Sequence, residues 1–154
     1  MRAFLFLALL AFVKASSLRN EEQTVPFEIV LQWTGAQTLL RTTCTRDEVA
    51  SIDAQLSANL GKHMVGVKGF INEADMESDQ LLPCDDHVCK ADYLIHASKV
   101  SQLDSARLNH IKNHLISVCN SLMGDTSKEL KYSSACRRSL MRSSCQASMT
   151  ITPF

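Results

Sequence analysis

Six cysteines constrain the fold of this 154-residue chain more than any other feature. All six follow a short apolar start, so an even number of thiols falls in the rest of the chain. In a small extracellular protein, an even count is typical of a disulfide framework, here of three bonds. Structural zinc sites use closer pairs, such as two cysteines separated by two residues, and no two cysteines have that spacing. The six are Cys44, Cys84, Cys89, Cys119, Cys136 and Cys145.

Residues 1–15 have the pattern of a secretory signal peptide. Arg2 precedes about eleven apolar residues, and Val13 and Ala15 occupy the −3 and −1 positions of a cut after Ala15. A bilayer span needs about 20 apolar residues, and this run is shorter. We therefore expect a secreted, extracellular protein with no membrane span.

Composition bounds the size of the domain and the class of partner. The 16 basic and 16 acidic residues balance, which excludes a nucleic-acid binder driven by bulk charge. A chain of this length forms one small domain. We expect a disordered N-terminus over 16–24, a single helical disulfide-rich domain over 25–147 and a C-terminal tail over 148–154.

Two segments have clear helical patterns. Thr45 and Glu48 form a capping box, which predicts a helix over 45–60 that ends at Gly61. A second helix is predicted by apolar residues in three- and four-residue steps, closed by Gly124. The apolar positions are Val49, Ile52, Leu56 and Leu60 in the first helix, and Leu108, Ile111, Leu115, Val118 and Leu122 in the second.

Further elements are also interpreted as helical. Two acids, Asp85 and Asp86, are candidate caps of a helix that runs to about Val100, and a last helix is expected from Asp125 or Thr126 to about Ser144. The segment 27–33 fits either a helix or a short strand, and we favour a helix because the only strand-like partner is 63–70. Residues 62–82 are expected to be a solvated acidic loop. The fold class is therefore all-α, with five or six helices.

Helical geometry limits the disulfide pairing without fixing it. Cys136 and Cys145 would point to opposite sides of one helix, and Cys84 and Cys89 would be too far apart on another. Excluding these two pairs leaves ten of the fifteen possible connectivities open.

The motifs of common enzymes are absent from the sequence. It has no Gly-rich phosphate loop, no nucleophile-elbow motif and no zinc-protease helix motif. His110 and His114 lie one helical turn apart and are a conceivable metal pair, but a solvated helix face is the preferred interpretation. We expect a non-catalytic protein without a metal or cofactor.

The cysteine spacing resembles that of the insect odorant-binding proteins, which are secreted six-cysteine helical carriers. Eight residues separate Cys136 from Cys145 as in that family, whereas Cys84 and Cys89 have four residues between them where the family has three. The resemblance implies carriage of a small hydrophobic ligand. It also implies the interlocked pairing Cys44–Cys89, Cys84–Cys136 and Cys119–Cys145.

Two fragments, 39–45 and 88–91, resemble pieces of interleukin-4/interleukin-13 type helical cytokines. This second resemblance implies a receptor ligand that acts through exposed helix faces. The short link expected at 124–126 speaks against that topology, because such cytokines need a long connection there; a last helix that begins near Ser134 would remove the objection.

We predict a secreted, non-catalytic carrier of a small hydrophobic ligand held between helices, with a cytokine-like receptor ligand as the alternative. The expected ligand-binding residues are Val88, Ile95, Leu108, Ile111, Leu115 and Val118, although ordinary core packing explains the same stripe. The expected partner-binding residues are Lys128, Lys131, Arg137, Arg138 and Arg142. The sequence names neither the ligand nor the receptor.

Overall fold

The computed structural model describes residues 23–33, 44–64, 67, 69–71 and 82–152. The predicted signal peptide, nearly all of the predicted disordered N-terminus and most of the predicted acidic loop lie outside these residues. The domain boundaries at the N-terminus therefore remain predictions.

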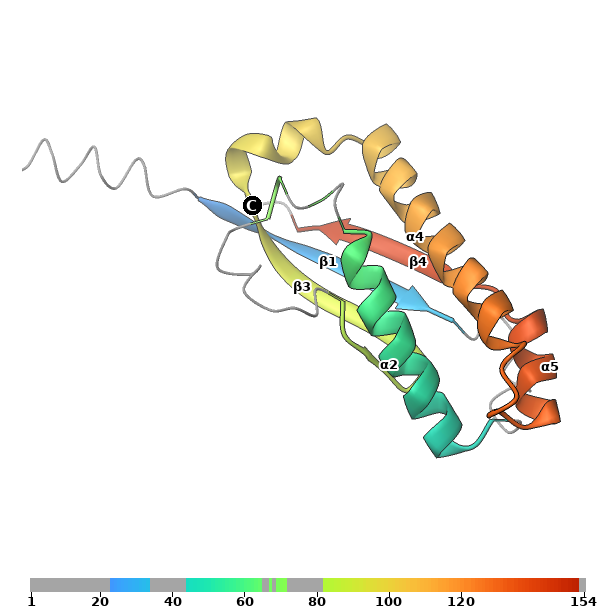
Figure 1. The fold of residues 1–154 in the computed structure, drawn as a ribbon. Helices are drawn as coiled ribbons and strands as arrows, with labels where there is room; N and C mark the ends of the chain where they lie inside the picture. The colour runs from blue at the N-terminus through green and yellow to red at the C-terminus, as the bar shows by residue number, and fades with distance from the viewer. Residues whose placement is uncertain (1–22, 34–43, 65–66, 68, 72–81, 153–154) are drawn as a thin grey trace, which may run out of the picture.

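The core of the fold is an antiparallel sheet of four strands in the order β2-β3-β1-β4 (Figure 1). Together with its helices the sheet makes a mixed α/β protein, so the all-α prediction is wrong. The strands are β1 (Thr24–Gln32), β2 (Cys84–Asp85), β3 (Val88–His96) and β4 (Gln146–Ile151).

Three α-helices and one short 3-10 helix complete the described fold. The two long helices, α2 and α4, pack side by side over one face of the sheet (Figure 1). The opposite face of the sheet carries exposed polar residues, including Gln32, Lys90 and Asp92. The helices are α2 (Arg46–Lys62), η3 (Ala97–Gln102), α4 (Ser105–Thr126) and α5 (Ser134–Arg142).

Most of the segment 27–33, for which we favoured a helix, belongs to strand β1, which ends at Gln32. Its alternate side chains Phe27, Ile29 and Leu31 have no exposed surface, because they face the helices. Strand β1 pairs with β3 on one side and with β4 on the other, so neither of its partners is the segment 63–70. The alternation was visible in the sequence, but both partners lie more than fifty residues away along the chain.

The helix predicted from Asp85 to about Val100 is also wrong, because this segment forms β2, a tight turn and β3. Cys89, Tyr93 and Ile95 point into the core with the period of two that a strand requires. Val88, which we expected to line one site with Ile95, lies on the outer side of β3.

The two strongest helical predictions are confirmed. The capping box of α2 is present, with the Thr45 hydroxyl accepting from the Glu48 amide at 3.1 Å and the Glu48 carboxylate accepting from the Thr45 amide at 2.9 Å. Helix α4 covers the predicted apolar stripe but continues past Gly124 to Thr126.

The C-terminal region differs from the prediction. Helix α5 begins at Ser134, so the link after α4 is longer than expected, and it ends at Arg142 rather than near Ser144. The predicted C-terminal tail contributes its first four residues to strand β4. The longer link removes one objection to a cytokine topology, but the sheet contradicts a four-helix fold.

All six cysteines form disulfides: Cys44–Cys136, Cys84–Cys89 and Cys119–Cys145. The three-disulfide framework is confirmed, and only its last pair agrees with the pairing implied by the odorant-binding resemblance. Our exclusion of Cys84–Cys89 is wrong because it assumed a helix. The two residues lie directly opposite each other across a β-hairpin and are bonded there.

Among the described helices, none is long and apolar enough to cross a membrane. The disulfides fit a protein of an oxidising compartment.

A candidate ligand-binding recess

A recess of about 650 Å³ lies between the first half of α2 and the turn that joins β2 to β3. Three carboxylates and one guanidinium border it, beside small apolar side chains and an imidazole. The lining residues are Cys44, Arg46, Val49, Ala50, Asp53, Asp85, Asp86 and His87.

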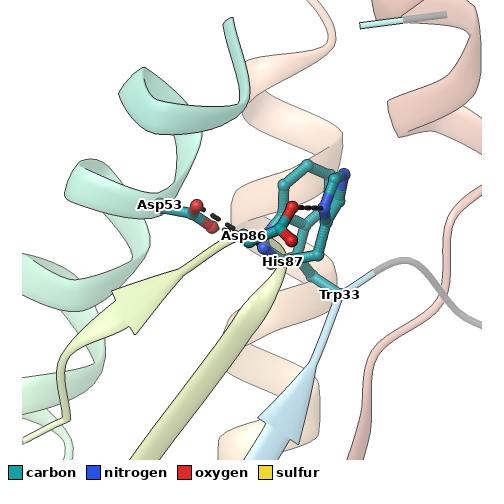
Figure 2. Close-up of polar contacts among 4 residues, drawn as sticks. All are labelled: Trp33, Asp53, Asp86 and His87. Atoms are coloured by element: carbon teal, nitrogen blue, oxygen red, sulfur yellow. Dashed lines mark hydrogen bonds and ion pairs between the residues drawn. The ribbon is translucent and has the colours of Figure 1, made fainter. Parts of the chain in front are cut away.

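Asp53 is the buried acid of this recess and is only 3% exposed. It lies one turn after Val49 on the face of α2 that packs against the sheet. One carboxylate oxygen accepts a hydrogen bond from the Trp33 indole N–H at 2.7 Å, and the other faces the His87 backbone N–H at 3.5 Å (Figure 2). Burial raises the pKa of Asp53, and these hydrogen bonds offset part of that rise.

Trp33 and His87 form an aromatic pair next to this acid, and of the two His87 lines the recess. Their ring centroids are 4.3 Å apart, and the Trp33 backbone N–H donates to the His87 carbonyl at 3.2 Å. Trp33 directly follows β1 and is 3% exposed, so its indole is fixed between the sheet and α2. One hydrogen-bonded group therefore joins β1, α2 and the hairpin turn (Figure 2).

The hairpin turn holds its two residues in an uncommon backbone conformation. Asp86 and His87 have φ angles of 45° and 71°, the left-handed values that a two-residue hairpin turn of type I′ requires. Asp and His tolerate this region better than most non-glycine residues. The Cys84–Cys89 disulfide closes the hairpin directly behind the turn, and His87 Nδ1 contacts the Asp86 carboxylate at 3.1 Å (Figure 2).

The recess is lined by charged, apolar and imidazole side chains. None of its lining residues carries a free hydroxyl or thiol nucleophile, since Cys44 is bonded to Cys136. Within the described residues, no group of three or more histidines, cysteines or acids is arranged to hold a metal. Asp85 and Asp86, both exposed, leave an excess of negative charge beside Arg46. Such a surface attracts an organic cation.

The predicted ligand-binding stripe is divided among several places. Ile95, Ile111 and Leu115 belong to the hydrophobic core. Half-buried Leu108 packs against that core, and half-buried Val118 borders a separate recess beside His63. Val88 adjoins His87 and lies at the opposite end of β3 from Ile95. The six residues do not line one described recess.

The predicted basic residues gather in and before α5. Arg138 and Arg142 are exposed on α5, and Arg137 is half-buried. Lys128 and Lys131 lie in the preceding link, where Lys131 forms an ion pair of 3.3 Å with Glu129. Two large apolar side chains are exposed in the same region, Leu130 at 84% and Met141 at 70%.

Sequence reasoning missed Asp53 and Trp33 as site residues. The signal for Asp53 was an acid on the apolar face of a predicted amphipathic helix, four residues after Val49. The signal for Trp33 was the alternation that marks a strand, which we interpreted as helix. Asp85 and Asp86 were noticed, but as candidate helix caps rather than as part of a hairpin.

Comparison of the chain with models of protein families, with curated proteins and with solved structures found no match.

Proposed function

We propose that this chain is a secreted, non-catalytic binding protein that takes a small organic cation with a short apolar body in the recess beside α2. The observation that carries the proposal is the buried Asp53 carboxylate in a recess whose rim has two further acids, Asp85 and Asp86. An ammonium or guanidinium group would lie among these acids, and its aliphatic part would contact Val49 and Ala50.

Burial makes the acidic site selective for charge. A carboxylate attracts a cation more strongly where water is partly excluded, and Asp53 is almost fully buried. A neutral ligand of the same shape would leave the three carboxylates unneutralised. An anionic ligand would be repelled by them, which makes the sign of the ligand charge the main determinant of specificity.

The covalent frame around the recess supports a preformed site. Cys44–Cys136 fixes the residue before the α2 cap, and Cys84–Cys89 fixes the hairpin that carries Asp85 and Asp86. A site that is already ordered loses less conformational entropy on binding. The proposal keeps the class of function predicted from the sequence, but it gives the ligand a positive charge and moves it away from the helical stripe.

Calorimetric titration of the disulfide-bonded chain with n-hexylammonium tests this function. We expect saturable binding that weakens about tenfold or more when Asp85→Asn and Asp86→Asn are combined, which removes two attractive charges. Asparagine tolerates positive φ, so the turn is retained at position 86. The control Asp92→Asn removes one exposed charge from β3 and should leave the affinity unchanged. No binding, or an equal loss in the control, would contradict the proposal.

The exposed face of α5 supports a second candidate, recognition of an acidic partner protein. Arg138, Met141 and Arg142 are all exposed on this short helix, which contains no acid. An apolar side chain surrounded by arginines is typical of a protein interface, where Arg and Met are enriched.

Co-purification from extracellular fluid, followed by mass spectrometry, tests this candidate. A specific partner should be lost with Arg138→Glu and Arg142→Glu combined and retained with Lys112→Glu on α4. Equal retention by all variants would argue against an α5 interface.

A further inference from the structure

Helices α2 and α4 bring two histidines together at the end of α2 that lies away from the recess. His63 is the C-cap residue of α2, and His114 lies near the middle of α4. His63 Nδ1 and His114 Nε2 are 3.3 Å apart, and the ring centroids are separated by 5.3 Å. The sequence indicated His110 as the conceivable companion of His114, but the companion is 51 residues away along the chain.

We propose that His63 and His114 form a binding site for a divalent transition-metal ion such as Zn²⁺, which bridges α2 and α4. Imidazole nitrogens bind zinc at about 2.0–2.1 Å, and two of them in tetrahedral geometry lie about 3.3–3.4 Å apart. The observed separation of 3.3 Å equals this distance.

The surroundings leave room to complete the coordination shell. Both histidines are exposed and border an open recess of about 340 Å³. Asp125 lines the same recess but is eleven residues after His114 on one helix, about 16 Å along its axis, so it is too distant to be a ligand. Two imidazoles with water in the remaining positions make an open site.

The binding step needs no net loss of protons from neutral imidazoles. One of the two facing nitrogens carries the proton of the hydrogen bond between the rings, so on metal binding that ring changes tautomer and its proton is placed on its other nitrogen. The metal ion then takes the lone pairs of His63 Nδ1 and His114 Nε2. The hydrogen bond between the two rings is replaced by two metal–nitrogen bonds. Imidazole is a ligand that Zn²⁺, Cu²⁺ and Ni²⁺ all accept.

Zinc titration of the purified, disulfide-bonded chain tests the site, with zinc chloride alone as the probe. We expect one Zn²⁺ per chain and a loss of affinity of about tenfold or more in both His63→Ala and His114→Ala, because removal of outer-shell partners alone already costs about that much. The matched control is His110→Ala, one turn before His114 on the exposed side of α4. It should bind zinc as tightly as the unaltered chain.

A nitrogen-resolved NMR spectrum identifies the ligands directly. Zinc should shift the ¹⁵N resonances of His63 Nδ1 and His114 Nε2 and leave those of His110 unchanged. Zinc should also raise the thermal midpoint of the unaltered chain but not that of the two single variants. Absence of zinc binding, binding that shifts other histidine nitrogens instead, or equal loss in His110→Ala would overturn the proposal.

Discussion

The two ends of α2 are held in different ways. At the N-terminal end, the capping box, the adjacent Cys44–Cys136 bond and the buried Asp53 fix the helix to its surroundings. At the C-terminal end, His63 contacts His114 through two exposed rings. The covalently framed end carries the proposed recess for an organic cation, and the end without a disulfide carries the proposed metal pair.

The carboxylate of Glu48 adds a further contact between the N-terminal end of α2 and the rest of the protein. Glu48 accepts from the Thr45 amide with one oxygen and from the Ser133 amide, at the cap of α5, with the other at 2.7 Å. The starts of α2 and α5 are thus joined, and Cys44–Cys136 joins the same two regions covalently. The comparison teaches that the end of α2 with the covalent and capping contacts is also the one nearer the buried Asp53, where misplacement of a hydrogen-bond partner is costly.

The largest expected effect concerns the three disulfides. Because the chain-entropy cost grows with loop length, replacing both cysteines of Cys44–Cys136, which are 92 residues apart, should lower the free energy of unfolding by about 5 kcal/mol. The same change at Cys84–Cys89, only five residues apart, should cost about 2 kcal/mol. Urea unfolding of the two double-alanine variants measures both. A greater loss at the hairpin would show that the hairpin, and not α2, is the main anchor.

A smaller loss is expected for Asp53→Asn. The amide has one acceptor oxygen, so it can serve only one of the two N–H groups, from Trp33 and His87, that face the carboxylate. The buried donor left over should cost about 1–3 kcal/mol in urea unfolding. The exposed Asp92→Asn serves as the control and should change the stability by less than about 0.5 kcal/mol.

Removal of the N-terminal cap of α2 should lower the free energy of unfolding more than removal of its C-terminal cap. Thr45→Ala removes the side-chain cap and should cost about 1 kcal/mol. His63→Ala, at the exposed C-cap, should change the free energy of unfolding by less than about 0.5 kcal/mol in metal-free buffer. Equal losses in urea unfolding would erase the contrast between the two ends.

Two acids in α2 should give opposite pH dependences. Burial raises the pKa of Asp53, so the folded state binds its proton more tightly, and this contribution to stability falls as pH rises from 3.8 through the folded pKa. Hydrogen bonds, first that from the Thr45 amide, lower the pKa of Glu48, so its contribution is lost as pH falls from 4.5 through the folded pKa.

Urea unfolding between about pH 3 and about pH 6 separates the two acids. The stability of the unaltered chain relative to Asp53→Asn should decrease as pH rises, and its stability relative to Glu48→Gln should increase. Slopes of the same sign would contradict the assigned causes of the pKa shifts.

Helices α2 and α4 could be predicted because their signals are local. The Thr45–Glu48 box and the stripe that includes Ile111 and Leu115 need no distant partner to be recognised. The strands could not be assigned in this way. In β3, Val88, Ala91 and Ile95 fit helical spacing as well as Cys89, Tyr93 and Ile95 fit a strand, and only pairing with β1 decides between them.

The sites were predicted less well than the helices. We placed Cys84 and Cys89 on one predicted helix, where they would be too far apart to bond. Because the segment is a β-hairpin, their disulfide and the turn between them were missed. The contact between His63 and His114 depends on how α2 packs against α4, which no local pattern encodes. Asp53 alone had a usable local signal, an acid on the apolar side of its helix.

Fluorescence of Trp33 tests the central claim about the recess most directly. The chain has one tryptophan, whose ring contacts that of His87 and whose indole N–H donates to Asp53, and both of these partners line the recess. Three probes that share a six-carbon chain, n-hexylammonium, n-hexanol and hexanoate, differ mainly in the charge of the head group. We predict a saturable change in emission with n-hexylammonium, a much weaker one with n-hexanol and none with hexanoate. An equal response to all three, or a response only to n-hexanol or hexanoate, would contradict a cation-binding recess at Asp53.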